Sequence, residues 1–402
     1  MGSDRKMKTG SIYSASDKAL FEALNQPKVT RSDLRQLFMS RGIVVSHQTS
    51  REALALHFSR LMHDYNDFQL LARLFGTKAR TERIASFRVI SKAKMQNFET
   101  AAHAVIEQIK KEDDSATMSY QKDGTLQISV RYKTMHFDKS EFKQVVNKSA
   151  IITVETSGKD LVLRGPQNDK VDGWCRTLLS NVEAQVDGVL EIDEISLENE
   201  PLPSVRSKFF ADLINAMSGF KRHDVTDVYV FKPKVKIKEL DESEESDPKD
   251  VQLGVHISRA SLRGEGVLQS AELQTLTQRG FYISKIIWQA TRNSEIDSDL
   301  FEFEAQFSEP ETCTKFSYLP RGYYGYMGPN EYAVSRTQCT LEEDRELSKL
   351  IEAAARSALP VNSQGVAKKL PSTKKRPAVS AKKPVIESSG ASLEESQTAL
   401  TK

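Results

Sequence analysis

Residues 30–52 bring arginines and small polar side chains together in a stretch that could bind an anion. The candidate contacts are Arg31, Arg35, Arg41, Ser46, His47, Gln48, Thr49, Ser50 and Arg51. Guanidinium, hydroxyl and amide groups donate hydrogen bonds to phosphate oxygens, which gives affinity for nucleic acid without reading its sequence. The two acidic residues of the stretch, Asp33 and Glu52, are both explained as helix caps. The pattern therefore indicates a phosphate-binding surface, and a solvated basic face on two helices is the alternative.

The first helix that would position these side chains is expected to follow Thr30. Thr30 can cap it, and Asp33 three residues later completes a capping box. Apolar residues then recur at helical spacing, at Leu34, Leu37 and Phe38. The helix is expected to stop at Arg41-Gly42, because glycine readily adopts the left-handed conformation that ends a helix.

A second helix is expected after a short extended link at residues 43–45. Thr49 and Glu52 have the spacing of a capping box at its start. Its apolar face would hold Leu54, Phe58, Leu61 and Met62. The polar candidate residues thus gather where the second helix begins. A helix N-terminus presents N–H groups and the positive end of a dipole to an anion.

This pattern resembles the SAP family of helix-extended-helix DNA-binding modules over about residues 28–62. The residues LRQLFMSRGI are similar to the family's first helix and its Arg-Gly-aliphatic turn, and TSREALALHFSRL is similar to its second helix. The resemblance implies DNA binding, mainly through the phosphate backbone. The family usually has a glycine just before the second helix, where this chain reads SHQTS. That departure bears on how closely the loop backbone could approach a phosphate.

The rest of the chain is expected to be mostly an α+β body. In LQISVRYKTMHF, apolar and polar residues alternate, which is typical of a half-buried strand in an antiparallel sheet. The expected divisions are a disordered 1–15, a helical SAP-like DNA-binding domain at 16–111, a first half of the body at 112–237, an acidic loop or linker at 238–250, a second half at 251–359 and a disordered basic tail at 360–402. The fold class is therefore α+β, with a small N-terminal helical domain and a mixed, mainly antiparallel sheet carrying helices.

The net charge of +2 conceals a segregation of charge along the chain. Residues 1–111 contain 19 Lys and Arg against 10 Asp and Glu, and residues 360–402 contain 8 against 3. The middle, 112–359, contains 30 against 42. Two basic ends favour contact with a polyanion, and the alternative is that they contact the acidic middle.

Composition also limits where the protein is expected to act. No apolar run approaches the roughly 18 residues of a membrane-spanning helix, and the N-terminus has no apolar secretory segment. The three cysteines, Cys175, Cys313 and Cys339, are too far apart in sequence for a disulfide framework or a zinc site. We therefore expect no membrane partner and an intracellular location, either cytoplasm or nucleoid, or the nucleus in a eukaryotic host.

Motifs for the common catalytic chemistries are absent from the sequence. There is no GxxxxGK[ST] phosphate loop, no HExxH and no GxSxG, and no cofactor is expected. A metal-dependent nuclease needs clustered carboxylates and a lysine, and the one Glu-x-Lys spacing, Glu141 to Lys143, lies in a segment that resembles the start of a helix. Glu302 and Glu304 alternate with apolar residues along a strand and are expected to face solvent.

One aromatic cluster, FSYLPRGYYGYMGPNEY at residues 316–332, surrounds Arg321 with tyrosines and glycines. A loop of this composition could stack exposed bases. It could also pack its tyrosines on the core, because tyrosine is amphipathic. Packing is the favoured interpretation.

Together these features predict a non-enzymatic DNA-binding protein. The N-terminal module would bind phosphates and the α+β body would engage a protein partner, as in an accessory subunit of a nucleic-acid-processing or antiviral-defence assembly. Two alternatives stay open. The chain could be a metal-dependent nuclease whose site no motif reveals, or a protein-interaction subunit whose basic ends are incidental.

Overall fold

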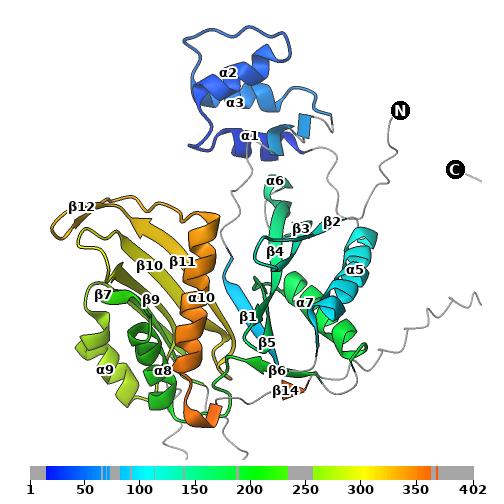
Figure 1. The fold of residues 1–402 in the computed structure, drawn as a ribbon. Helices are drawn as coiled ribbons and strands as arrows, with labels where there is room; N and C mark the ends of the chain where they lie inside the picture. Colours follow the sequence, from blue (N-terminus) through cyan, green and yellow to red (C-terminus); the bar gives the residue numbers. More distant parts are fainter. Residues whose placement is uncertain are drawn as a thin grey trace, which may run out of the picture. The chain divides into compact units, whose positions relative to one another are not determined.

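The N-terminal part of the chain folds as a small helical module (Figure 1). The computed structural model describes residues 15–64, 67–68, 70–72, 82–90, 93–112, 114–138, 141–186, 190–233, 257–363 and 368–369. The module contains α1 (Asp17–Leu24), α2 (Arg31–Met39) and α3 (Arg51–Ser59). Their apolar faces share one core, which includes Leu20, Leu24, Leu34, Phe38, Leu54 and Phe58. Helix, link and helix therefore follow one another as the apolar spacing predicts.

α2 begins and ends as its sequence predicts. The Thr30 hydroxyl accepts the N–H of Asp33 at 3.2 Å, and the Asp33 carboxylate accepts the N–H of Thr30 at 2.8 Å. The hydrogen bond from the Thr30 backbone lowers the pKa of Asp33. After the helix, Gly42 has a φ of 71°, which side chains other than glycine rarely adopt, and its N–H donates to the carbonyl of Met39.

α3 begins one residue later than the sequence suggests. Ser50 is its N-cap, and the Ser50 hydroxyl accepts the N–H of Ala53 at 3.2 Å. The expected capping box of Thr49 and Glu52 is therefore wrong, because the neighbouring serine supplies the same chemistry one position on. The expected apolar face is also shorter, since Met62 lies beyond the end of α3 and is 93% exposed.

The first half of the body is a sheet with helices on one face (Figure 1). Its elements are β1 (Ile84–Ile90), α5 (Met95–Lys111), β2 (Ser115–Tyr120), β3 (Leu126–Met135), α6 (Glu141–Gln144), β4 (Val145–Ser157), β5 (Asp160–Pro166) and α7 (Asp169–Glu183). Its strands are antiparallel in the order β2-β3-β4-β5-β1. The buried residues of β3 face α5 and α7, where Tyr132 contacts Trp174 with ring centroids 5.3 Å apart.

The second half of the body has a similar construction. Its elements are β6 (Glu191–Glu194), α8 (Pro203–Asn215), β7 (Phe220–Phe231), β8 (Arg259–Arg263), a 3-10 turn (Val267–Gln269), α9 (Ala271–Gln278), β9 (Tyr282–Arg292), β10 (Leu300–Glu309), β11 (Thr314–Tyr324), β12 (Tyr326–Gly328), β13 (Glu331–Tyr332) and α10 (Leu341–Ser357). The main strands run antiparallel in the order β11-β10-β9-β7-β8. α8 and α10 pack on one face of them, in a core with Phe209, Trp288, Phe303 and Ile351.

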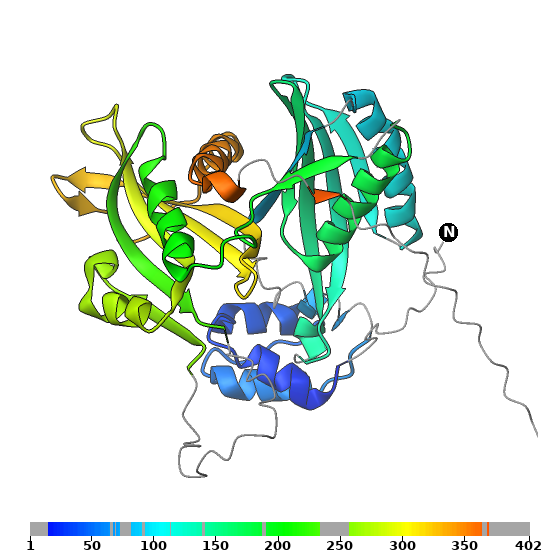
Figure 2. The same ribbon diagram turned by 90° about the horizontal axis from the view of Figure 1, so that it is seen from below.

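The order of elements repeats between the halves, although the sequence shows no repeat. β1-α5-β2-β3-β4-β5-α7 corresponds to β6-α8-β7-β9-β10-β11-α10. α6 in the first half, and β8, α9, β12 and β13 in the second, have no counterpart in this order. Figure 2 shows the strands of the two halves, which β1 and β11 join into one continuous sheet. The predicted fold class, α+β with a mainly antiparallel sheet, is confirmed.

Two expected boundaries differ from the structure. The expected helical domain extends from 16 to 111, but β1 lies inside that range and pairs with β5, β6 and β11. The strand is buried on both faces at Ser86 and Phe87, so its short polar–apolar pattern resembles an amphipathic helix as much as a strand. Residues from 82 onward therefore belong to the body, and the helical domain does not extend to 111.

The tail also begins later than its composition predicts. Residues 361–363 form a 3-10 turn in which the buried hydroxyl of Ser363 donates to Glu200 at 3.1 Å. The backbone of β14 (Lys368–Lys369) adds to the edge of β6. Each of these contacts joins residues that are far apart in the sequence, so composition could not reveal them. The acidic residues 238–250 and the tail from 370 lie outside the described residues.

The two halves meet through backbone pairing and a set of buried charges. β1 pairs with β11 at Ile84 and Tyr318 and with β6 at four further residue pairs, from Phe87 to Ile90. α10 completes the joint, since the buried carboxylate of Glu352 accepts from Arg164 of β5 at 2.6 Å and from Arg356 at 3.1 Å. Burial alone would raise the pKa of Glu352, but the two arginines outweigh it and lower that pKa.

Within the described ranges, no helix combines the length and apolar character needed to cross a bilayer.

We expect Glu352→Ala to destabilise the protein by about 3 kcal/mol, because it leaves buried guanidinium groups short of a partner. Glu346→Ala, which removes an exposed carboxylate from the same helix, is the matched control and should change stability by less than about 0.5 kcal/mol. Urea unfolding of the full chain measures both variants. Equal midpoints for the two variants would contradict the proposed importance of the joint.

Candidate nucleic-acid interface

The candidate phosphate-binding residues divide into two groups in the structure. Arg31 is exposed at the first position of α2, and Arg35 is half-buried one turn later. The Arg35 guanidinium donates to the carbonyl of His47 at 2.5 Å. This bond holds α2 against the loop that precedes α3. A permanent positive charge therefore lies beside the residues that lead into a helix N-terminus.

The loop itself is held by its own small polar residues. The backbone N–H of Gln48 donates to the Ser46 hydroxyl at 3.2 Å, and that of Thr49 donates to the Ser46 carbonyl at 3.3 Å. The side chains of Ser46, His47, Gln48 and Ser50 are exposed. We call Arg31, Arg35 and residues 46–50 the polar face of the module. The positive end of the α3 dipole opens on this face, where anions are favoured.

Arg51 ties the start of α3 to the rest of the module. Its guanidinium donates to the carbonyl of Gln26 at 2.7 Å and is half-buried. A carbonyl does not neutralise a guanidinium, so Arg51 keeps its charge near the polar face. Glu52, exposed in the first turn of α3, opposes that charge.

The contacts of Arg41 hold its guanidinium inside the module and not on the polar face. Its guanidinium pairs with Asp67 at 2.6 Å and donates to the carbonyl of Met62 at 2.7 Å. It also lies over the ring of Phe58, 5.0 Å from the centroid. The ion pair compensates its charge and its donors are used to close the module. We therefore do not include Arg41 in the candidate interface, although its position beside Gly42 in the sequence suggests phosphate contact.

His63 completes the contacts around Arg41. Its Nε2–H donates to the carbonyl of Phe58 at 2.9 Å, and its Nδ1 accepts from Arg41 at 2.8 Å. Both contacts require the neutral imidazole with its proton on Nε2. Burial, joined by the charge of Arg41, lowers the pKa of His63 from its usual 6.5.

The acidic residues considered for catalysis occupy other environments than expected. Glu302 and Glu304 on β10 do not face solvent; they are 7% and 5% exposed and lie in ion pairs. The backbone at Glu141 and Lys143 is helical, as expected, and their side chains lie outside the described ones. In the described part of the chain, no group of three His, Cys, Asp or Glu side chains is arranged to hold a metal ion.

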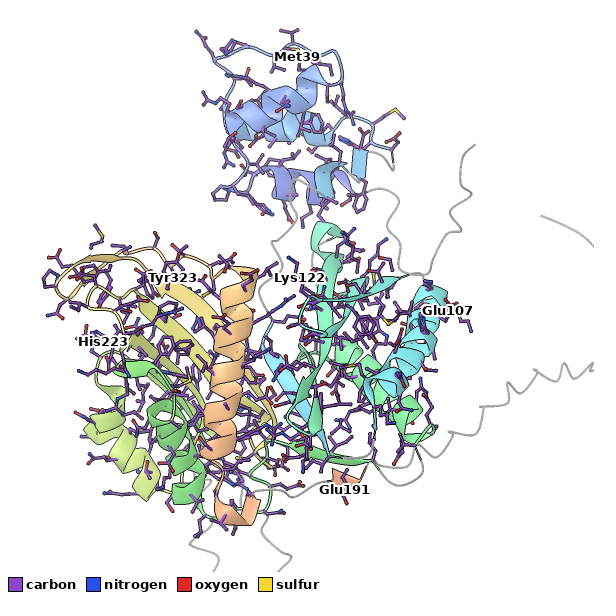
Figure 3. The ribbon with its side chains drawn as sticks, viewed as in Figure 1. Met39, Glu107, Lys122, Glu191, His223 and Tyr323 are labelled. Atoms are coloured by element: carbon purple, nitrogen blue, oxygen red, sulfur yellow. The ribbon has the colours of Figure 1, made fainter. Side chains whose placement is uncertain are left out.

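The tyrosine cluster of residues 316–332 is a strand rather than a loop over most of its length. Tyr318 is fully buried on β11, and Tyr323 packs against the core of the second half (Figure 3). The favoured interpretation, packing, is confirmed for these two. Tyr324 is half-exposed on the other face, where its hydroxyl donates to Glu302 at 3.1 Å.

Comparison with known proteins leaves the function to be argued from the structure. No protein-family model matches the chain. No curated protein sequence matches it either.

The lowered pKa of His63 predicts that the module loses stability in mild acid. The folded state favours the neutral ring of His63. The stabilisation that this ring contributes is therefore complete above pH 6.5 and is lost as the pH falls through the lowered pKa. Hydrogen exchange of the α3 amides, corrected for intrinsic rates, should show less protection at about pH 5.5 than at about pH 7.5.

His63→Gln is the control, because an amide can accept from Arg41 and donate to Phe58 without titrating. Its α3 protection should depend less on pH than that of the unmodified protein. The same pH dependence in both proteins would show that His63 is not the titrating group.

Proposed function

We propose that this protein binds DNA without acting on it, and that its N-terminal module contacts the phosphate backbone. The observation that carries the proposal is the hydrogen bond from Arg35 to the carbonyl of His47. It fixes a guanidinium beside the exposed loop that leads into α3. Cation, exposed hydroxyls and a helix N-terminus together match the donors that phosphate oxygens accept.

The expected binding is modest and strongly dependent on salt. Arg31, Arg35 and Arg51 could neutralise about three phosphates, which gives a slope of log affinity against log salt of about −3. Such contacts do not read bases, so little sequence preference is expected. The SAP-like pattern of residues 28–62 supports the same proposal. The missing glycine before α3 is compatible with it, because here side chains rather than a closely approaching backbone would make the contacts.

A second candidate function has its own observation. Three apolar side chains of the module are exposed: Met39 is 63%, Val44 83% and Met62 93% exposed. Figure 3 shows Met39 at the end of α2. Exposed apolar residues that gather in one patch mark protein-binding surfaces. The module could therefore dock a protein partner, as in an accessory subunit of a nucleic-acid-processing or defence assembly, with or without DNA.

Arg31→Glu combined with Arg35→Glu should abolish binding to a short labelled DNA duplex, because two attractions become repulsions. If some binding remains, the slope of log affinity against log salt should fall in magnitude by about 2. Arg60→Glu is the matched control, since Arg60 is exposed at the opposite end of α3 and should have a much smaller effect. Fluorescence anisotropy at several salt concentrations measures affinity and slope.

Arg41→Ala separates binding from folding in the same assay. It should lower the stability of the module by about 1–3 kcal/mol and leave the affinity of the folded protein unchanged. Unaltered DNA affinity in the Arg31/Arg35 variant, with an unaltered melting curve, would reject the proposed interface and favour the protein-docking candidate.

The nuclease alternative predicts a different result. We expect DNA and RNA to stay intact when incubated with the protein and magnesium or manganese. Cleavage that Glu141→Ala or Lys143→Ala abolishes would replace the binding proposal with an enzymatic one.

A further inference from the structure

Each half of the body has helices packed on one face of its strands, and the halves differ in what covers the opposite face. In the first half, α10 covers the face opposite α5 and α7. Its polar side contacts that face through Arg345 to Gln127 at 2.9 Å and Lys349 to Glu155 at 2.7 Å. In the second half, α8 and α10 both pack on one face, and the opposite face carries charged side chains. We call this opposite face the open sheet face; its residues are Arg83, Tyr229, Lys285, Glu302, Glu304, Arg321, Tyr324 and Arg336.

The charges of the open sheet face are arranged in two layers. The side chains of Glu302 and Glu304 are 8% and 7% exposed, whereas those of the four cations are 22–33% exposed. Glu304 accepts from Lys285 at 2.8 Å and from Arg83 at 3.1 Å. The carboxylates therefore lie beneath and the cations face outward.

Arg321 and Arg336 complete this layer around Glu302. Arg321 bridges the two carboxylates, at 3.0 Å from Glu302 and 3.6 Å from Glu304, and Arg336 also pairs with Glu302. Burial alone would raise the pKa of Glu304, but Lys285, Arg83 and Arg321 outweigh it and lower that pKa. Glu304 thus stays charged, and four cations against two carboxylates leave an excess of two positive charges.

An exposed aromatic ring lies next to these cations. Tyr229 of β7 is 37% exposed and is paired in register with Lys285 of β9. The Lys285 ammonium lies 5.0 Å from the centre of the Tyr229 ring. A lysine beside an accessible tyrosine on a sheet surface supplies both a phosphate contact and a stacking surface for a base.

We propose that the open sheet face binds single-stranded nucleic acid. Phosphates would contact the outward cations, and an unpaired base would stack on Tyr229. A duplex cannot use this surface in the same way, because its bases already stack on one another and expose only their edges. The proposal does not rest on the DNA-binding function of the N-terminal module, which would contact phosphates of either form.

The distribution of charge also fixes where the strand would cross. At the end of β7 near His223 (Figure 3), a hollow of about 650 Å³ opens beside Glu302. Its lining includes the carboxylates of Asp224, Asp227, Glu265 and Glu302 and one guanidinium, that of Arg263, so negative charge is in excess. Phosphates would be repelled there. The strand is therefore expected to follow the row from Tyr229 through Lys285 toward Arg83.

The test uses the full chain and a labelled single-stranded oligodeoxythymidine. Tyr229→Ala should weaken binding about 5- to 150-fold, the loss expected for one stacked base. Tyr229→Phe keeps the ring and should bind like the unmodified protein. Tyr120→Ala, which removes an exposed tyrosine from β2 of the first half, is the matched control and should also have no effect.

A second variant keeps the proposal testable if Tyr229→Ala fails to fold. Lys285→Gln removes one outward cation and should lower the magnitude of the salt slope by about 1. Both variants are repeated with Arg31→Glu and Arg35→Glu present, so that binding by the module is removed from the measurement. Equal single-strand affinity for Tyr229→Ala, Tyr229→Phe and the unmodified protein, or an unchanged salt slope for folded Lys285→Gln, would overturn the proposal, whatever the module does.

Discussion

The interaction on which the body depends is the buried ion pair between Glu352 of α10 and Arg164 of β5. One side of this helix is apolar and completes the core of the second half, through residues such as Ile351. The other side carries the charges that hold the first half, where Glu352 lies between Arg164 and Arg356 and accepts from the hydroxyl of Tyr318 at 3.2 Å. β1 pairs with β11 at one residue pair and with β6 at four, and these buried charges add side-chain contacts between the halves.

The use of α10 in the joint has a consequence for the surface. In each half, helices pack on one face of the strands, and the opposite face needs another cover. α10 alone cannot cover this opposite face in both halves. α10 covers this face in the first half. In the second half the corresponding face carries an outer layer of cations over buried carboxylates. The open sheet face and the polar face of the module thus share a chemistry, guanidinium or ammonium groups held in place by neutral or acidic partners. That chemistry suits phosphate in both places.

The sequence predicts local structure well and long-range pairing poorly. The capping of α2, its glycine stop and the alternation in β3 are confirmed because neighbouring residues determine them. The sequence does not reveal the strand β1, because its buried residues Ser86, Phe87 and Val89 lie on both faces and give no clear period. Glu302 and Glu304 look like a solvated strand face, since Arg83 is more than 200 residues away in sequence. Arg41 suggested phosphate contact for the same reason, because nothing near it in sequence reveals its pairing with Asp67.

We propose that nucleic acid binds this protein at the polar face of the module and at the open sheet face. Ultraviolet crosslinking of the full chain to a single-stranded oligonucleotide, followed by mass spectrometry of the crosslinked peptides, tests it most directly. We expect crosslinks at Tyr229 and within residues 46–50, and none at Tyr120. Crosslinks confined to the first half of the body, or spread evenly over exposed tyrosines, would contradict it.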